Sequence, residues 1–310
     1  MTGPVIEARA LSKWYGEVIG LNGLELNVHP GITGMVGPNG SGKSTFFKLV
    51  SGLIKPSVGT IRVLGEDPWG NIDLHARVGL CPDYDNLNDE HTARYFLKTV
   101  GGLHGMSGSQ LDIRIDEVFK TVGMTEAADR RIGGFSKGMR QRMKIAGAML
   151  HEPELLMLDE PLSGTDPLGR NDIIDLVHEL HRDLGHHVIV SSHVLHEVER
   201  LTDNVVVVYK GRAVATGHIR EIRDLIDQHP HNIVVEADKL DTLVARFVRM
   251  DSVVSVYFAS DRSHVVLQVT RPDEFFNSMP GLIRETGANV TKMYSKDDDL
   301  ESVFRYLVGV

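Results

Sequence analysis

A glycine-rich stretch that ends in Lys-Ser-Thr constrains the fold of this chain more than any other feature. The stretch consists of Gly37, Pro38, Asn39, Gly40, Ser41, Gly42, Lys43, Ser44 and Thr45. Glycine tolerates backbone angles that residues with a Cβ avoid, so we expect Gly37, Gly40 and Gly42 to turn consecutive N–H groups inward. Inward N–H groups form a nest that binds an anion. A nest of this composition is typical of phosphate binding.

The residues around this stretch favour the same interpretation. The apolar run 32–36 precedes it, and apolar positions at helical spacing follow over 45–50. In the order strand, loop and helix, the positive end of the helix points at bound phosphates. Lys43 then reaches the β and γ oxygens of a nucleotide triphosphate, and Ser44 offers its hydroxyl to Mg²⁺. The segment therefore predicts a phosphate loop, the name used below for residues 37–45.

Composition narrows the class of protein. The 310 residues have room for about two domains. The net charge of −9 disfavours nucleic acid as a partner. Cys81 is the single cysteine, which excludes a disulfide framework within the chain and fits a reducing cytosol.

The sequence also argues against a membrane span and a metal site. No apolar run approaches the roughly 18 residues that span a bilayer, so we expect no intrinsic membrane span. Histidines 178, 181, 186 and 187 lie in a segment rich in charge, but no matching constellation of carboxylates or thiols accompanies them, so we expect no metal site there.

The apolar pattern of the first two thirds of the chain predicts an α/β fold. Three short alternating strands come first, at 5–8, 24–28 and 60–64. Three helices follow, at 93–100, 111–122 and 138–150. Three apolar strands come last, at 155–158, 188–190 and 205–208, separated by helices at 168–184 and 195–201. We expect an antiparallel edge sheet, an inserted helical subdomain at about residues 84–150, and a buried parallel sheet.

A second, smaller domain is expected after a linker. A polar helix at 218–228 leads to Pro230, and we place the linker at 221–231, between domains of residues 1–220 and 232–310. The second domain reads strand 233–237, helix 239–250, strands 253–259 and 264–270, helix 272–286 and strand 289–294. This is the order of a ferredoxin-like α+β fold. A last helix at 300–307 is expected to pack on its own domain, or else to stabilise a dimer or serve regulation.

Chemistry-bearing side chains follow two of the buried strands. Asp159 and Glu160 come directly after strand 155–158, and His193 comes just after strand 188–190. The carboxyl ends of parallel strands are where such sheets bind ligands. Asp159 can hold Mg²⁺ through water, and Glu160 can polarise the water that attacks a γ-phosphate. The alternative is that the two acids are only solvated at a strand end.

A second anion site is expected at the start of the helix 138–150. Ser136 is a helix-capping residue type, and Gly138 leaves backbone N–H groups accessible. One γ-phosphate cannot use this site and the phosphate loop in one subunit if they lie in different lobes, so we expect Ser136 and Gly138 to meet the ATP of a partner copy. The alternative is an ordinary capped helix. The basic cluster 140–144 is interpreted as a solvated helix face.

Four motifs in this order resemble the ATP-binding-cassette ATPases, and the resemblance covers about residues 5–220. The motifs are GPNGSGKST, FSKGMRQR, LLMLDEPLSGTDP and Ser191-Ser192-His193. The resemblance implies ATP and Mg²⁺ as the bound groups. In the family's scheme Lys43, Ser44 and Thr45 hold the phosphates and Mg²⁺, Asp159 supports Mg²⁺, and Glu160 is the general base.

The resemblance also implies roles for residues outside the phosphate loop. Tyr15 stacks on adenine, although the tryptophan before it is a rival for this role. Ser136 and Gly138 clasp the γ-phosphate of the opposite subunit, and Asp166 lies in the loop that crosses the dimer interface. His193 contacts the γ-phosphate and the attacking water.

The chain departs from the family's pattern at three places. Ser136-Lys137-Gly138-Met139 replaces the usual Ser-Gly-Gly-Gln and resembles a branch that serves exporters whose membrane subunits are separate chains. Asp83 follows the strand ending at Cys81, where the family normally has a glutamine that contacts Mg²⁺. An aspartate there either coordinates Mg²⁺ through a water or repels the γ-phosphate. Thr165 replaces a common leucine, which is expected to matter little.

These features together predict an ATP-hydrolysing subunit that works as a homodimer with two ATPs between the copies. By analogy with the family, it powers export of an unidentified cargo through a separate integral membrane subunit, docked near residues 83–97. It is then cytoplasmic and peripheral on the inner face of the cell membrane. One alternative is a soluble member that acts on protein or ribosomes without a membrane subunit. Another is a phosphate-loop kinase, which has no use for the serine-capped helix.

Overall fold

The computed structural model describes residues 3–85, 87–222 and 230–295. The chain divides into two compact units, Met1–His218 and Ile219–Val310, and each is described here by itself. The first unit is built on two sheets, and the second on one. The predicted fold class, an α/β core with an antiparallel edge sheet, a helical subdomain and a ferredoxin-like unit, is confirmed.

The central sheet of the first unit has six strands in the order β5-β6-β7-β3-β8-β9. They are β3 (Ile32–Val36), β5 (Val78–Cys81), β6 (Leu155–Leu158), β7 (His187–Ser192), β8 (Asn204–Tyr209) and β9 (Arg212–His218). The pairs from β5 to β8 are parallel, and only β9 is antiparallel. Both faces are covered, which explains why β3 and β6 are buried along their whole length.

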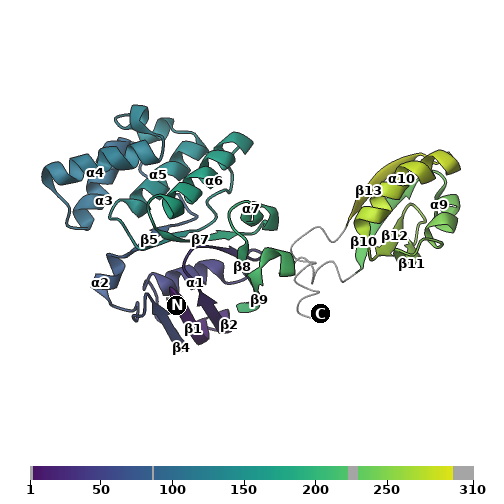
Figure 1. Ribbon diagram of the computed structural model, residues 1–310, viewed down its shortest axis with the longest axis horizontal. Helices are drawn as coiled ribbons and strands as arrows, with labels where there is room; N and C mark the ends of the chain where they lie inside the picture. The colour runs from purple at the N-terminus through teal and green to yellow at the C-terminus, as the bar shows by residue number, and fades with distance from the viewer. Residues whose placement is uncertain (1–2, 86, 223–229, 296–310) are drawn as a thin grey trace. The chain divides into compact units, whose positions relative to one another are not determined.

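The second sheet is antiparallel, in the order β2-β1-β4. Its strands are β1 (Ile6–Tyr15), β2 (Val18–Val28) and β4 (Val58–Val63). Figure 1 shows this sheet on one side of the central sheet, with helix α1 (Lys43–Val50) between them. Phe46 and Phe47 of α1 are buried in a hydrophobic core that also contains Leu155 and Met157 of β6. This packing fixes the helix that starts within the phosphate loop.

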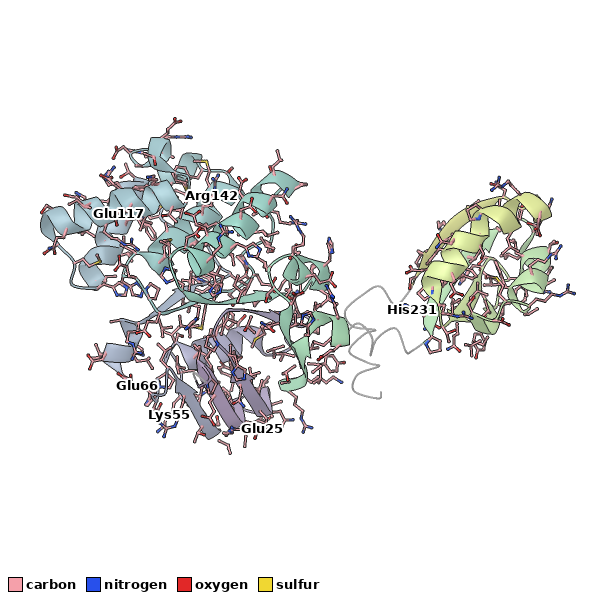
Figure 2. The ribbon with its side chains drawn as sticks, in the orientation of Figure 1. Glu25, Lys55, Glu66, Glu117, Arg142 and His231 are labelled. Carbon is pink, nitrogen blue, oxygen red and sulfur yellow. The ribbon has the colours of Figure 1, made fainter. Side chains whose placement is uncertain are left out.

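Helices cover the other face of the central sheet (Figure 1). They are α3 (Ala93–Leu103), α4 (Gly108–Thr121), α5 (Lys137–Met149) and α6 (Pro167–Arg182), with 3₁₀ turns at Thr125–Ala127 and Ile132–Gly134. The hydrophobic core beneath these helices contains Leu156 and Leu158, which alternate along β6 with the two residues that face α1. Side-chain caps set the helix starts, because Ser136 accepts from the N–H of Met139 and Asp166 from that of Gly169. Figure 2 shows Glu117 and Arg142 on this helical side, and Glu25, Lys55 and Glu66 on the side of the antiparallel sheet.

The second unit has the order strand, helix, strand, strand, helix, strand. The elements are β10 (His231–Ala237), α9 (Leu240–Phe247), β11 (Val253–Phe258), β12 (Val265–Val269), α10 (Pro272–Thr286) and β13 (Val290–Ser295). The sheet order is β11-β12-β10-β13, with antiparallel pairs throughout. Phe247 of α9 and Phe275 of α10 meet with ring centroids 5.4 Å apart in its core. This arrangement is ferredoxin-like, as predicted.

Several elements differ from the sequence-based expectation. Helix α2 (Ile72–His75) and strand β9 were not predicted, and α7 (Leu195–Glu199) is shorter than expected. Strand β9 has no alternating apolar pattern, and its extended form comes from pairing with β8, Asn204 opposite His218. His218 therefore belongs to a strand, and the helix expected at 218–228 starts at residue 219 and is described only to residue 222. The helix predicted at 300–307 lies outside the described residues.

Candidate active site

The phosphate loop connects β3 to α1. Gly40 and Gly42 have φ angles of 79° and 114°, in the left-handed region that glycine adopts most easily. The expectation was wrong for Gly37, which does not have a positive φ. A Cβ at Gly37 would lie only 2.3 Å from the carbonyl oxygen of Val208. Glycine is therefore needed there because β8 passes close by.

Lys43 lies in the first turn of α1 and is 5% exposed. Its Nζ donates to the carbonyl oxygen of Gly37 at 2.6 Å and lies 3.3 Å from Oε1 of Glu160. Pro38 accepts the N–H of Ser41 at 3.1 Å, which closes the loop around the ammonium group. The cation is thus held at the carboxyl end of β3, where a phosphate bound by the loop N–H groups would meet it.

The remaining loop residues fit a phosphate ligand. Asn39 and Ser44 are exposed, and Thr45 is half-buried beside Ser44. The hydroxyl of Ser41 is buried and has no hydrogen-bond partner among the described residues. A buried hydroxyl without a partner is unfavourable, and an incoming phosphate oxygen would satisfy it.

The two acids predicted after β6 have different surroundings. Asp159 is buried, and its Oδ1 accepts a hydrogen bond of 2.5 Å from the hydroxyl of Ser191 in β7. The same hydroxyl accepts the N–H of Glu160 at 2.9 Å. Ser191 therefore orients both acids from the neighbouring strand. Ser191 was expected only as part of the motif Ser191-Ser192-His193, without a role of its own, although a serine at the end of a buried strand was a usable signal.

Glu160 joins the lysine to the histidine. Its Oε2 lies 2.9 Å from Nδ1 of His193, while its Oε1 faces Lys43. The side chain is 11% exposed, and its backbone φ of 49° is unusual for a residue with a Cβ. Lys43, Glu160 and His193 thus form a line across the carboxyl ends of β3, β6 and β7. A carboxylate in this position can accept a proton from a nearby water.

Asp83 lies in the loop after β5, near the same acids. Partial burial, together with the negative charges of Asp159 and Glu160, raises the pKa of the Asp83 carboxyl. The loop itself is held by Lys144 of α5, whose Nζ donates to the carbonyl oxygens of Pro82 and Asp83 at 2.9 and 3.0 Å. Asp83 therefore lies in the neighbourhood of Asp159, as the family resemblance implied.

The basic cluster 140–144 is not the solvated face that was expected. Lys144 is buried against the loop after β5. Arg140 forms ion pairs with Asp85 and Asp89, with N–O distances of 2.5 and 2.6 Å. The first of these pairs lowers the pKa of Asp85. The cluster joins α5 to this loop because its partners come from elsewhere in the chain, which helical periodicity cannot show.

Ser136, Gly138 and Asp166 line a hollow of about 330 Å³ that is distinct from the group around Lys43. The hollow lies where α5 and α6 begin, so N-terminal turns of both helices border it. The N-terminal turns of the two helices and the side chain of Lys137 favour an anion there, whereas the carboxylates of Asp166 and Asp172, which also line the hollow, oppose one. The structure therefore keeps the second predicted anion site apart from the phosphate loop.

Tyr15 and Trp14, the two candidates for adenine stacking, are both about half exposed at the end of β1. Tyr15 shares Gly20 as a neighbour with the phosphate loop. A Cβ built on Gly20 would lie 3.0 Å from the Tyr15 ring and 3.1 Å from the Thr45 hydroxyl. This shared neighbour favours Tyr15 over Trp14 as the aromatic beside a nucleotide.

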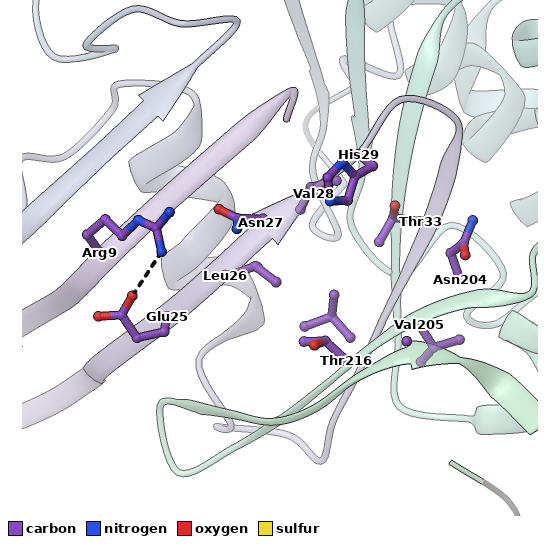
Figure 3. A pocket seen from close by; sticks show the side chains of 12 residues that line it. Arg9, Glu25, Leu26, Asn27, Val28, His29, Thr33, Asn204, Val205 and Thr216 are labelled. Carbon is purple, nitrogen blue, oxygen red and sulfur yellow. Dashed lines mark ion pairs between the residues drawn. The ribbon is translucent and has the colours of Figure 1, made fainter. Parts of the chain in front are cut away.

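A larger hollow, of about 440 Å³, lies at the opposite end of the strands. Figure 3 shows Arg9 and Glu25 at one side of it, 3.8 Å apart as an ion pair, and Thr33 and Asn204 at the other. Thr33 and Asn204 are at the amino ends of β3 and β8, whereas the phosphate loop follows the carboxyl end of β3. This hollow is therefore separate from the candidate active site.

Comparison with known proteins agrees with the geometry. A model of the ABC transporter family matches residues 21–163. The bacitracin transport ATP-binding protein of Bacillus licheniformis is 32% identical over 98% of this chain and 97% of its own length. The chain belongs to the ABC transporter ATP-binding proteins. It is the ATPase component of a transporter.

Other ABC proteins show the same relationship. The daunorubicin/doxorubicin resistance ATP-binding protein of Streptomyces peucetius is 30% identical, covering 98% of this chain and 92% of that protein. The solved structure of CbiO1 from Clostridium perfringens, part of the ABC transporter complex CbiONQ, has a TM-score of 0.65 and 26% identity. It covers 80% of this chain and 96% of that one. Within the described ranges of this ABC protein, no helix combines the length and apolar character needed to cross a bilayer.

Proposed function

We propose that this ABC ATPase works as a homodimer that binds two MgATP between its copies and powers export through a separate membrane subunit. The observation that carries the proposal is the line of Lys43, Glu160 and His193 at the ends of three adjacent strands. The chain would lie in the cytoplasm, peripheral on the inner face of the cell membrane. Residues 1–220 form the nucleotide-binding domain in this proposal, and residues 232–310, after a linker, an accessory domain.

One copy supplies the phosphate loop and the catalytic acid. Loop N–H groups and Lys43 bind the phosphates, and Tyr15 stacks on adenine. The exposed hydroxyl of Ser44 and the buried carboxylate of Asp159 would hold Mg²⁺, with Asp83 as a ligand through water. These are the oxygen donors that Mg²⁺ prefers, and the ion would neutralise negative charge on the β- and γ-phosphates. Glu160 accepts the proton of the attacking water.

The other copy supplies the start of α5. Ser136 and Gly138 contact the γ-phosphate from across the dimer, and Asp166 lies in the loop at the interface. The hollow that these three residues line is open on the single subunit and separate from the phosphate loop. ATP binding then favours the closed pair and hydrolysis releases it, which can move a membrane partner. His193 contacts the γ-phosphate and the water.

We expect Asp83→Gln to change both Mg²⁺ dependence and the pH dependence of stability. The folded state raises the pKa of Asp83, so it disfavours the charged form. The wild type is therefore destabilised at neutral pH and recovers as the pH falls through this raised pKa. The variant should unfold at a higher temperature than the wild type at pH 7, and the difference should shrink toward about pH 4, near the ordinary aspartate pKa.

Thermal unfolding at several pH values and ATPase rate against Mg²⁺ concentration measure these effects. If Asp83 holds Mg²⁺ through water, the variant needs more Mg²⁺ for half-maximal rate. Asp67→Asn, at an exposed position after β4, is the matched charge control. Identical curves for wild type and Asp83→Gln would mean that Asp83 is only a loop acid.

A partly apolar hollow supports docking of a membrane subunit near residues 83–97. It has a volume of about 220 Å³, and Pro82, Phe96 and Val100 are among the residues that line it. Tyr84 and Tyr95 are exposed on the adjacent loop and helix. Aromatic side chains of this kind are enriched at protein interfaces. Relatives named for bacitracin, daunorubicin and Nod factor differ in cargo, so the membrane subunit is the place to look for cargo specificity.

Affinity purification of the tagged chain from detergent-treated membranes tests this docking. We expect a polytopic membrane protein to co-purify with the wild type and to be lost with Tyr95→Glu, since the charge enters the docking surface. Ile113→Glu, equally exposed on α4, should retain it. ATPase activity without any such partner would favour the alternative of a soluble ABC ATPase acting on protein or ribosomes. Phosphorylation of a small acceptor would favour a kinase.

A further inference from the structure

A buried carboxyl outside the proposed catalytic group lies next to the His193 loop. Glu197, in the short helix α7, is 8% exposed. Its Oε2 accepts a hydrogen bond of 2.8 Å from the hydroxyl of Ser192, and its Oε1 lies 3.5 Å from Nη1 of Arg170 in α6. A buried carboxylate is unfavourable unless charged or polar partners compensate it. Glu197 is therefore held between the end of β7 and the start of α6.

The Ser192 hydroxyl shapes the turn that presents His193. Besides donating to Glu197, it accepts the N–H of Val194 at 3.0 Å. The residues on both sides of His193 are thereby joined, with the histidine at the tip of the turn. The carbonyl oxygen of Ser192 also accepts the N–H of Gly37 in the phosphate loop at 3.2 Å. Glu197 orients the hydroxyl on which this arrangement depends.

Arg170 extends the chain of contacts to the loop that contains Asp166. Its Nη2 lies 3.5 Å from the carbonyl oxygen of Thr165, the residue before Asp166. Its Nε is buried without a hydrogen-bond partner among the residues described. Both contacts of the guanidinium are long for a charged hydrogen bond, which is usually 2.7–2.9 Å. The loop can therefore approach Arg170 more closely when it shifts, because donor capacity is left over.

We propose that Glu197 and Arg170 are positioning residues that set the His193 turn and link it to the Asp166 loop. The inference rests on the roles proposed above for His193 and for the dimer interface. When the interface closes on Asp166, Arg170 moves with the start of α6 and Glu197 follows it. The Ser192 turn then brings His193, which already contacts Glu160 at 2.9 Å, toward the γ-phosphate. Neither residue touches ATP, so their effect is on geometry at the reacting atoms.

The test uses the full-length chain and separates the two partners of Glu197. Glu197→Gln keeps an oxygen that can accept from Ser192 but places an amide against Arg170. We expect kcat to fall by about tenfold, less than the roughly 10²-fold that a misplacement of 1 Å can cost, with KM for ATP unchanged within about twofold. KM is preserved because the phosphate loop and Lys43 are unaltered. Arg170→Met should give the same loss, and the double variant no more than either single one.

Whether Glu197 acts through His193 is decided by repeating the measurement in a chain that lacks the His193 side chain. In His193→Ala, Glu197→Gln should leave the residual rate unchanged. Asp175→Asn, at an exposed position on α6 with the same change of charge, should match the parent chain in each background. Circular dichroism melts check that each variant is folded.

Two outcomes overturn the proposal. One is an equal loss from Glu197→Gln with and without His193, and the other is additive losses from Arg170→Met and Glu197→Gln. Failure of the proposed function has a different signature, because His193→Ala alone would then leave the ATPase rate of the wild-type chain unchanged.

Discussion

Replacing Glu160 with glutamine is expected to lower ATP hydrolysis by a factor of about 10² to 10⁴, the range that a general base contributes. Glutamine keeps the size of the side chain but cannot take a proton from water. The carboxylate now sits 3.3 Å from Lys43 Nζ and 2.9 Å from His193 Nδ1. Both neighbours remain in the variant, so ATP binding should persist. Phosphate release and equilibrium binding of a fluorescent ATP analogue measure the two effects separately.

The same variant should accumulate as an ATP-bound dimer. Bound triphosphate joins the copies in the proposed mechanism, and slow hydrolysis prevents their release. Size-exclusion chromatography with multi-angle light scattering in saturating MgATP should report twice the monomer mass, falling to the monomer without nucleotide. Glu90→Gln, at an exposed position, should stay active and show no such accumulation. A Glu160→Gln chain that binds ATP but stays monomeric would contradict the shared site.

Lys43→Met should abolish measurable hydrolysis and weaken ATP binding by at least about tenfold. Methionine fills a similar volume but removes the positive charge that faces both the loop carbonyls and Glu160. The variant also leaves the nearly buried Glu160 without its cation, which lowers thermal stability. The double variant with Glu160→Gln should regain part of that stability, since the carboxylate left without its cation is then replaced by a neutral amide. Lys48→Met, exposed on the same helix, is the control.

Mixing two inactive variants tests which copy supplies each half of the site. Ser136→Arg places a large side chain at the start of α5, where the γ-phosphate of the partner copy would bind, and leaves the phosphate loop intact. Lys43→Met disables the phosphate loop and leaves Ser136 intact. A mixed dimer then contains one complete site. We expect hydrolysis to return to a clear fraction of the wild-type rate on mixing, and not in either variant alone. If no activity returns over a range of mixing ratios, Ser136 and Lys43 do not form one ATP site across the dimer. They then either act within the same subunit or do not share a site.

Local pattern was enough to predict most of the scaffold. The apolar runs at β3, β6 and β8 are typical of strands that are buried on both faces of a parallel sheet. Ser136 and Asp166 cap helices where their residue types favour a cap. The order of elements after residue 230 matched the ferredoxin-like sheet. Strand β9 was missed because its conformation comes from pairing with β8, which residue spacing does not encode.

The sequence by itself determined the phosphate loop, the acids after β6 and the histidine after β7, because strand, turn and helix signals are local and each side chain follows a strand end. The tertiary structure alone decided how they are held. Ser191 orients Asp159 and Glu160 from another strand. Lys144 binds the carbonyl oxygen of Asp83 and so holds the loop after β5. Glycine is required at position 37 because β8 passes beside it. These contacts join residues tens to more than a hundred and fifty positions apart. Only the order of strands in the folded sheet brings them within bonding distance.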